Sequence, residues 1–244
     1  MSDVRETLEK VYNELAIKDF PDGERIRFIA ELGASDDIEY HYKLICDSWK
    51  SGRRLYLENS FDRHGAEGIE FLFAKLCEVE GDIIKVLTAY LIAEILSKSR
   101  HRDFYAGFCK RLIPILISEI KTCDEVLRRK LIIALGWVGT SNEIGFLTRQ
   151  MLSDDDALCR VWSASSLVQM SFHGVSKEEV CEASKDAFAK VLSEEKDIQA
   201  CGLILESVQT LYGKKWVSYS AVEDVDEARI EKGRNSALRF LSKL

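Results

Sequence analysis

The segment that decides the fold is Asp124–Thr140, DEVLRRKLIIALGWVGT, because it can be aligned with a second segment of the chain. It begins with an acidic residue, has Arg128 four positions later, and continues through apolar residues to Gly-Trp-Val-Gly. Thirty-two residues further on, DALCRVWSASSLVQM begins at Asp156 and has Arg160 at the same offset. The first segment is therefore predicted to be one copy of a repeat rather than an isolated core helix.

Two looser copies flank this pair. The earlier copy, DIIKVLTAYLIAEIL, begins at Asp82 and has Lys85 as its basic residue, whereas the later copy, DIQACGLILESVQTL, begins at Asp197 and lacks one. Each copy follows another amphipathic segment and a short acidic turn, and two of these segments, Thr140–Glu143 and Ser176–Glu179, begin with a capping-box pattern. Antiparallel helix pairs at a period of roughly 32–43 residues predict an α-solenoid, in which neighbouring pairs share a core.

At this point the sequence resembles the HEAT-repeat family, most specifically over residues 104–171 and more loosely over 67–213. That family has a proline in the first helix, an acidic turn, and an arginine early in the second helix. Pro114, Asp124 and Arg128 supply all three features. The resemblance implies a right-handed superhelix in which an aspartate of one repeat meets an arginine of its neighbour. In this chain that ladder would contain Asp124, Arg128, Asp156 and Arg160.

The whole chain, residues 1–244, is predicted to form a single all-α domain. Residues 1–66 are expected to form N-terminal capping helices, 67–213 about four helix pairs, and 214–244 a loop followed by a C-terminal capping helix. The only strand-like segment is KKWVSYSAV, residues 214–222, and a loop is the better interpretation. A solenoid needs such caps because a terminal repeat would otherwise expose its apolar face.

Composition and charge restrict the possible partners. A net charge of −7 over 244 residues disfavours nonspecific binding to nucleic acid or to an anionic membrane. No apolar run approaches the ~20 residues of a membrane span, and MSDVRETLEKVYNEL at the start lacks a signal-peptide core, so a cytoplasmic location is expected. None of the cysteines forms a CxxC pair, so we expect seven reduced, buried side chains: Cys46, Cys77, Cys109, Cys123, Cys159, Cys181 and Cys201.

Two groups of residues are candidates for contact with a partner. Trp137 and Trp162 lie on second helices, which line the concave face of such solenoids, although both could instead fill the core. Glu94 and Glu206 interrupt the same apolar helices and face either the groove or solvent. The other group is a basic island, WKSGRRLYLENSFDRHG, whose alternative role is a solvated connection between helices. Its candidate contact residues are Trp49, Arg53, Arg54, Tyr56, Arg63 and His64.

The sequence contains no motif typical of catalysis, cofactor binding or metal binding. The four histidines are far apart in the sequence, and none precedes a glutamate as in the iron-dependent hydroxylases that are built on HEAT repeats. HExxH, GxSxG and a glycine-rich phosphate loop do not occur. The serine-rich WSASSL, residues 162–167, is better explained by close helix packing than by a nucleophile. We therefore expect neither an enzyme nor a bound cofactor.

The resemblance favours a noncatalytic protein that binds a protein or peptide on its concave face, as a scaffold or as an immunity-type inhibitor. The alternative is an enzyme that acts on nucleic acid, similar to the alkylpurine DNA glycosylases with a HEAT-like fold, although their groove is strongly basic. HEAT-like repeats also occur in chromophore lyase subunits, but nothing in this sequence points to bilin chemistry.

One observation distinguishes the two main hypotheses. Pairing of Arg128 and Arg160 with aspartates between repeats would favour a protein partner, whereas one continuous basic groove would favour nucleic acid. The residues of that groove would be Arg53, Arg54, Lys85, Arg128, Arg129 and Arg160.

Overall fold

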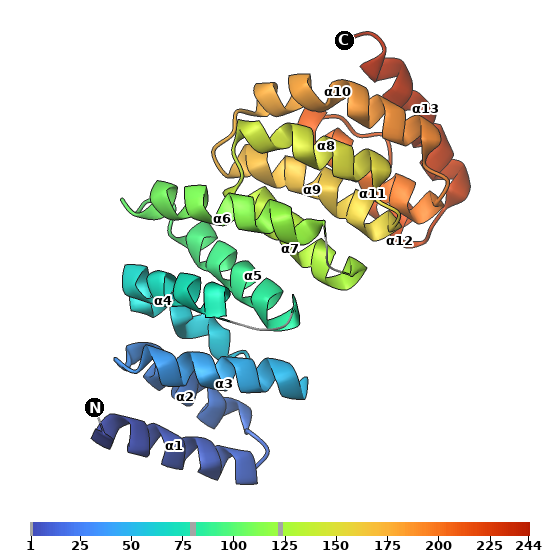
Figure 1. Cartoon of the computed structure of the whole chain (residues 1–244). Coiled ribbons are helices and arrows are strands. Elements are labelled where there is room, and N and C mark those ends of the chain that lie inside the picture. The colour runs from blue at the N-terminus through green and yellow to red at the C-terminus, as the bar shows by residue number, and fades with distance from the viewer. Residues whose placement is uncertain (1, 79–81, 122–123) are drawn as a thin grey trace. The chain divides into compact units, whose positions relative to one another are not determined.

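The computed structural model describes residues 2–78, 82–121 and 124–244 (Figure 1). Within these ranges every regular element is a helix and none is a strand, which confirms the predicted all-α class. The chain divides into two compact units, Met1–Ile95 and Leu96–Leu244. None of the helices in these ranges combines the length and apolarity needed to cross a membrane.

The first unit is built around a 3-10 helix, η1, which contacts α2, α3 and α4. Asp37 begins α3 by accepting a hydrogen bond from the backbone N–H of Tyr40, and Gly52 ends it in the left-handed conformation. The elements of this unit are α1 (Ser2–Ile17), α2 (Asp22–Ala34), α3 (Ile38–Ser51), η1 (Leu57–His64), α4 (Gly65–Glu78) and most of α5 (Asp82–Lys98).

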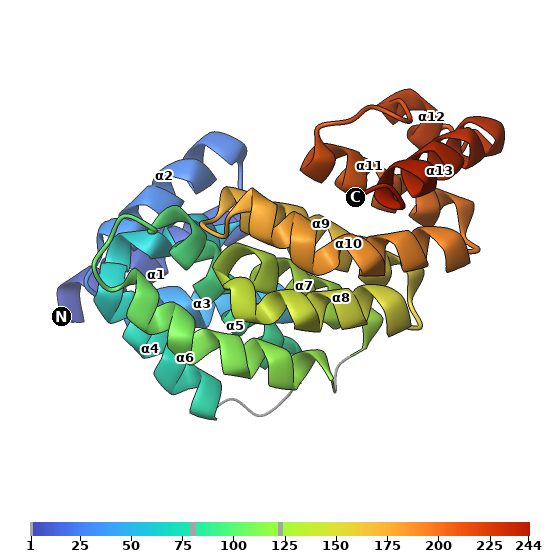
Figure 2. The same ribbon diagram turned by 90° about the horizontal axis from the view of Figure 1, so that it is seen from above.

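The second unit has two layers of helices (Figure 1, Figure 2). In one layer α7, α9 and α11 lie side by side; in the other α8 lies beside α10, and each packs on the helix that follows it in the chain. Helix α6 packs on α7, and α13 covers both α10 and α11. The elements are α6 (Tyr105–Ile120), α7 (Glu125–Val138), η2 (Ser141–Glu143), α8 (Ile144–Ser153), α9 (Ala157–Phe172), α10 (Lys177–Glu194), α11 (Ile198–Tyr212), α12 (Tyr219–Glu223) and α13 (Glu227–Leu241).

The aspartates that open the copies in the sequence are N-caps of the helices in the first of these layers. Asp124, Asp156 and Asp197 each accept a hydrogen bond from the backbone N–H three residues later, at 2.9, 2.7 and 2.9 Å respectively. A carboxylate at this position satisfies an otherwise unpaired N–H group and interacts favourably with the helix dipole. The sequence offset of 32 residues therefore corresponds to equivalent helix starts.

Small residues allow α7 and α9 to approach closely. A Cβ atom added to Gly136 would lie 2.8 Å from the Cβ atom of Ser166, which is closer than two side chains tolerate. The Oγ atom of Ser166 donates a hydrogen bond of 2.9 Å to the carbonyl oxygen of Ile132 on the neighbouring helix. Ser163 is also fully buried and bonds within its own helix. The packing role predicted for the serine-rich segment is thus confirmed.

Three local predictions need correction. The segment 214–222 is not entirely a loop, because Ser218 caps the short helix α12. Cys77 is exposed and Cys181 is only partly buried, so the prediction of uniformly buried cysteines was wrong for these two. Cys46, Cys109, Cys159 and Cys201 are buried as expected, and Cys123 lies outside the described residues.

Candidate partner-binding surface

Buried ion pairs join the second helices to the turns that follow them in the second unit. Arg128 of α7 donates two hydrogen bonds of 2.8 Å, from Nε and Nη2, to the carboxylate of Asp154 in the turn before α9. That carboxylate also accepts a hydrogen bond from the backbone N–H of Asp156, and its side chain is 2% exposed. Because the pair is bidentate and satisfied on both sides, it stabilises the position of α7 against the next helix pair.

Arg160 of α9 repeats this arrangement one helix pair later. Its Nε and Nη2 atoms donate to the two carboxylate oxygens of Glu195 at 2.7 and 2.8 Å, and its Nη1 atom donates to the carbonyl oxygen of Asp154 at 2.8 Å. Burial favours the neutral form of Glu195, but the hydrogen bonds and charge of Arg160, together with the backbone N–H groups of Lys196 and Asp197, outweigh it, so the pKa of this carboxyl lies below its usual value. Arg160 therefore links two successive turns.

The partners in this series differ from the predicted ladder. Arg128 and Arg160 bind acidic residues of the following turn, but these are Asp154 and Glu195 rather than the aspartates that begin the helices. Asp124 acts as the N-cap of α7. The sequence could not distinguish the alternatives because each turn carries several acidic residues within a few positions.

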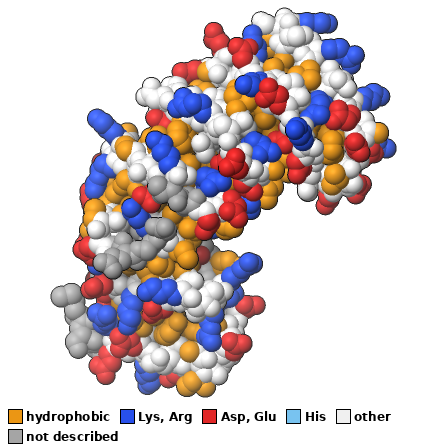
Figure 3. Space-filling model, turned by 45° about the vertical axis from the view of Figure 1, so that its right-hand side comes forward, with side chains coloured by type: hydrophobic (Ala, Val, Ile, Leu, Met, Phe, Trp, Pro, Cys, Tyr) orange, Lys and Arg blue, Asp and Glu red, His pale blue; other side chains and the backbone are white. Residues whose placement is uncertain are grey.

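A third pair is formed by Asp156, which caps α9 and also accepts two hydrogen bonds from Arg129, of 2.9 and 2.8 Å. These hydrogen bonds lower the pKa of Asp156 to about 2. All three arginines that the second unit would contribute to a basic groove are thus neutralised by carboxylates. On the face drawn in Figure 3, basic and acidic side chains are interspersed. This distribution does not resemble the continuous positive surface that binding to a nucleic acid duplex requires.

The outer face of α7, α9 and α11 carries a stripe of accessible side chains. Between residues 161 and 170 of α9, only Trp162, Ser165 and Gln169 are not buried, and this spacing places them on one helix face. The equivalent positions on α7 and α11 are also accessible. We refer to these twelve positions as the second-helix surface: Val126, Lys130, Ile133, Trp137, Leu158, Trp162, Ser165, Gln169, Gln199, Leu203, Glu206 and Thr210.

Apolar side chains are unusually accessible on this surface. Val126, Leu158 and Trp162 are 55%, 40% and 38% exposed respectively. Val126 and Leu158 lie two residues after the capping aspartates of their helices, so they occupy equivalent positions. Trp137, the other tryptophan proposed as a contact residue, is half-buried near the end of α7. The sequence had identified both tryptophans but missed Val126 and Leu158, although their shared offset was visible in it.

A groove of about 300 Å³ lies between α9 and α11 on the same surface. Leu158 and Trp162 line it from α9, and Leu203 and Glu206 line it from α11. Glu206, which the sequence left facing either the groove or solvent, lines the groove. Its partial burial there raises the pKa of the carboxyl.

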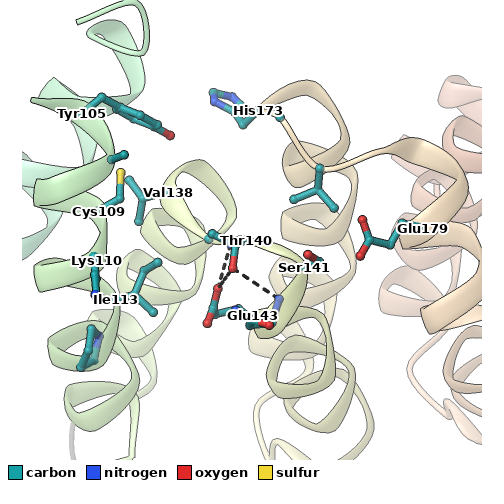
Figure 4. Close-up of a pocket in the computed structure, with 16 residues that line it drawn as sticks. Tyr105, Cys109, Lys110, Ile113, Val138, Thr140, Ser141, Glu143, His173 and Glu179 are labelled. Atoms are coloured by element: carbon teal, nitrogen blue, oxygen red, sulfur yellow. Dashed lines mark hydrogen bonds between the residues drawn. The ribbon is translucent and has the colours of Figure 1, made fainter. Parts of the chain in front are cut away.

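A larger pocket of about 680 Å³ lies at the other end of α7 and α9, where the chain leaves these helices (Figure 4). Glu143 is satisfied there by two hydrogen bonds from Thr140, of 2.8 and 2.7 Å, which complete the predicted capping box. Burial raises the pKa of the Cys109 thiol to about 11, so this sulfur is neutral and unreactive. Burial also lowers the pKa of His173, which faces Tyr105 across the pocket. These side chains do not form an activated nucleophile.

The basic island Trp49–Gly65 packs largely against its own unit. The guanidinium group of Arg53 lies 6.0 Å from the ring centre of Phe20, and Arg63 donates a hydrogen bond of 3.3 Å to the carbonyl oxygen of Ala30. The ring of Tyr56 lies below the guanidinium group of another arginine, Arg25, at 5.8 Å. Trp49 is half-buried, whereas the side chain of Arg54 is exposed. Arg54 is thus a predicted contact residue of the island that remains accessible to a partner.

Two histidines that are far apart in the sequence meet in the first unit. The Nε2 atom of the fully buried His41 lies 2.8 Å from the carbonyl oxygen of Leu57, and its Nδ1 atom lies 2.9 Å from Nε2 of His64. Because a carbonyl only accepts, Nε2 of His41 carries the proton, and Nδ1 accepts a hydrogen bond from His64. His64, a predicted contact residue, is therefore part of the interior network.

No group of three or more His, Cys, Asp and Glu side chains that could hold a metal ion occurs among the residues that the structure describes. Comparisons of the chain with protein-family models, with curated proteins and with solved structures find no match.

Proposed function

We propose that this chain is a HEAT-like α-solenoid protein that binds a protein or peptide partner through its second-helix surface and catalyses no reaction. The observation that carries the proposal is the exposure of Val126 and Leu158 at aligned positions of α7 and α9, together with that of Trp162 one turn after Leu158. Large apolar side chains that line up on one face mark sites of protein interaction, and tryptophan is enriched among the residues that contribute most to binding.

Local features support the HEAT-like interpretation. Pro114 lies within the first helix of a pair, a capping aspartate begins the second helix, and an arginine follows early in that helix. The ion pairs of Arg128 and Arg160 connect one helix pair to the next, which is the function that such a ladder has in a stacked array. On this interpretation α7, α9 and α11 line the concave face, and α13 is the C-terminal cap.

The pairing of the arginines argues against the alternative, an enzyme that acts on nucleic acid. Arg128, Arg129 and Arg160 make bidentate contacts with carboxylates, so they are not available to neutralise phosphates. Glu206 adds a negative charge to the groove that would have to hold the nucleic acid. A scaffold or an inhibitor of another protein is consistent with both features.

The proposal is tested by affinity capture of the tagged protein from the extract of its own cells, followed by mass spectrometry before and after nuclease treatment. We expect one dominant protein that survives nuclease treatment and is lost when Trp162→Ala is the bait. The matched control is Phe172→Ala, which removes a 62% exposed aromatic side chain from the end of the same helix, outside the surface. Recovery of nucleic acid, or of a protein that binds the Trp162→Ala variant equally well, would contradict the proposal.

A further inference from the structure

The groove between α9 and α11 contains a carboxylate for which the described residues provide no partner. Glu206 lines the groove and is half-buried, and no described residue donates a hydrogen bond to its carboxylate or forms an ion pair with it. Burial without a compensating cation disfavours the charged form and raises the pKa of this acid. The free protein therefore has a carboxyl group at a position where solvation of its charged form is reduced and no described residue compensates for that charge.

Two buried acids of the same unit, Asp154 and Glu195, have the partners that Glu206 lacks. Asp154 and Glu195 each bind an arginine through two hydrogen bonds and also accept hydrogen bonds from backbone N–H groups. Glu206 lies on the accessible face of α11, where the side chain facing it would come from a bound molecule. The acid that lacks a cationic partner among the described residues thus lies on the surface that we propose as the binding site.

The remaining walls of the groove suit a long cationic side chain. Trp162 presents an indole ring, which attracts a cation to its face, and Glu206 is on the opposite helix. Leu158, Val168 and Leu203 supply apolar surface that can cover the methylene groups of lysine or arginine. A basic side chain in the groove would contact the ring, the carboxylate and the aliphatic wall together.

We propose that this groove binds a lysine or arginine side chain of the partner, with the cation held between Trp162 and the carboxylate of Glu206. The inference rests on the proposed function, because it names the chemistry of the partner at that same surface. Arginine can bind the carboxylate through two parallel hydrogen bonds and stack on the indole, whereas lysine offers a single point charge. The net charge of −7 also favours a basic partner segment.

The test is selection of binders from a phage-displayed library of random peptides on the full-length protein, with the Trp162→Ala variant used for counter-selection. We expect the enriched peptides to share one basic position, and the identity of that residue distinguishes arginine from lysine. Affinity of a selected peptide, measured by fluorescence anisotropy, should fall about tenfold with Glu206→Gln, since the substitution removes the negative charge that strengthens the hydrogen bond to the cation. Replacing the basic residue of the peptide with citrulline or norleucine should have a similar effect.

The matched control is Glu182→Gln, which removes a carboxylate from an exposed position on α10 and should leave affinity unchanged. Thermal melting of Glu206→Gln checks the fold, and we expect no loss of stability because an uncompensated charge is removed. Trp162-dependent peptides without a shared basic residue, or with affinity insensitive to Glu206→Gln, would overturn this inference while the proposed function stands. Failure to enrich any Trp162-dependent peptide would overturn both.

Discussion

The basic island Trp49–Gly65 and the second-helix surface contain similar residue types but use them in opposite ways. In the island, aromatic and basic side chains contact their own unit: Phe61 is fully buried, His64 binds His41, and Arg53 lies over Phe20. In the second unit Arg128, Arg129 and Arg160 are paired with acids near the starts of their helices, while apolar side chains remain exposed along the helices. Composition alone therefore does not identify a binding surface, because the same residues can serve the interior.

The difference follows from the local backbone. Residues Leu57–His64 of the island fold into a 3-10 helix that contacts three helices, and its side chains Leu57, Ser60 and Phe61 are therefore buried. Helices α7, α9 and α11 are covered by α6, α8 and α10 on one side, which leaves a regular stripe of each helix accessible. A regular array exposes equivalent positions repeatedly, and this repetition is what makes a continuous surface.

We expect the greatest loss of stability when a buried ion pair of the second unit is broken. Arg160→Ala should lower the free energy of unfolding by about 3–5 kcal/mol, because it leaves the buried carboxylate of Glu195 without its partner. Chemical denaturation followed by circular dichroism measures this change. Arg149→Ala on the exposed face of α8 is the matched control and should change stability by less than about 0.5 kcal/mol. Equal effects of the two variants would refute the structural role of the pair.

An intermediate effect concerns the interior of the first unit. Burial lowers the pKa of His41 to about 4, below its ordinary value of 6.5, so the folded state disfavours the protonated ring. The free energy of unfolding is therefore unaffected by the protonation of this histidine above about pH 6.5. As the pH falls from 6.5 toward 4, this free energy decreases by about 3 kcal/mol in total.

Amide hydrogen exchange of α3 at several pH values would measure this dependence. His41→Gln should reduce stability at neutral pH and also reduce the slope between about pH 6.5 and 4, with the remaining slope coming in part from His64, whose pKa is also lowered by burial. An unchanged slope in that variant would show that His41 does not bury a neutral ring.

Substitutions in the basic island should have only small effects on stability and none on binding at the second-helix surface. Arg53→Glu should cost about 0.5–1 kcal/mol, because it removes a contact with the ring of Phe20, and Arg54→Glu should cost less. Neither substitution should reduce binding of a peptide selected on the second-helix surface, as measured by anisotropy. Loss of binding without loss of melting temperature would show that the island is also a contact surface.

The sequence predicted those parts of the fold that depend on local patterns. The helix starts at Asp124 and Asp156 and the close packing of the serine-rich segment follow from capping and residue size, which neighbouring residues determine. The partner of Arg128 depends on which of two acids, Asp154 or Asp156, points inward, and only the packed turn decides this.

Contacts between residues that are far apart in the sequence could not be predicted either, because only the packed structure decides them. His41 and His64 belong to different elements, and nothing in the spacing between them indicates a hydrogen bond. In the candidate site, Trp162 could be selected by residue type, whereas the groove around Glu206 results from the packing of α9 on α11.

The ion pairs of Arg128, Arg129 and Arg160 all have the same direction, and this polarity determines where the array can grow. Each arginine points to an acid that follows it, until Cys201 occupies the position of the next arginine and Arg234 of α13 binds the carbonyl of Glu195 instead. An in-frame duplication of residues 124–155 would add a second copy of Arg128 and of Asp154, so each arginine would still have an acid in the turn that follows. A helix pair added after α11 would find Cys201, and no arginine, at the position that corresponds to Arg160. The helix array is thus extensible from within, and its series of arginine pairs ends at α11.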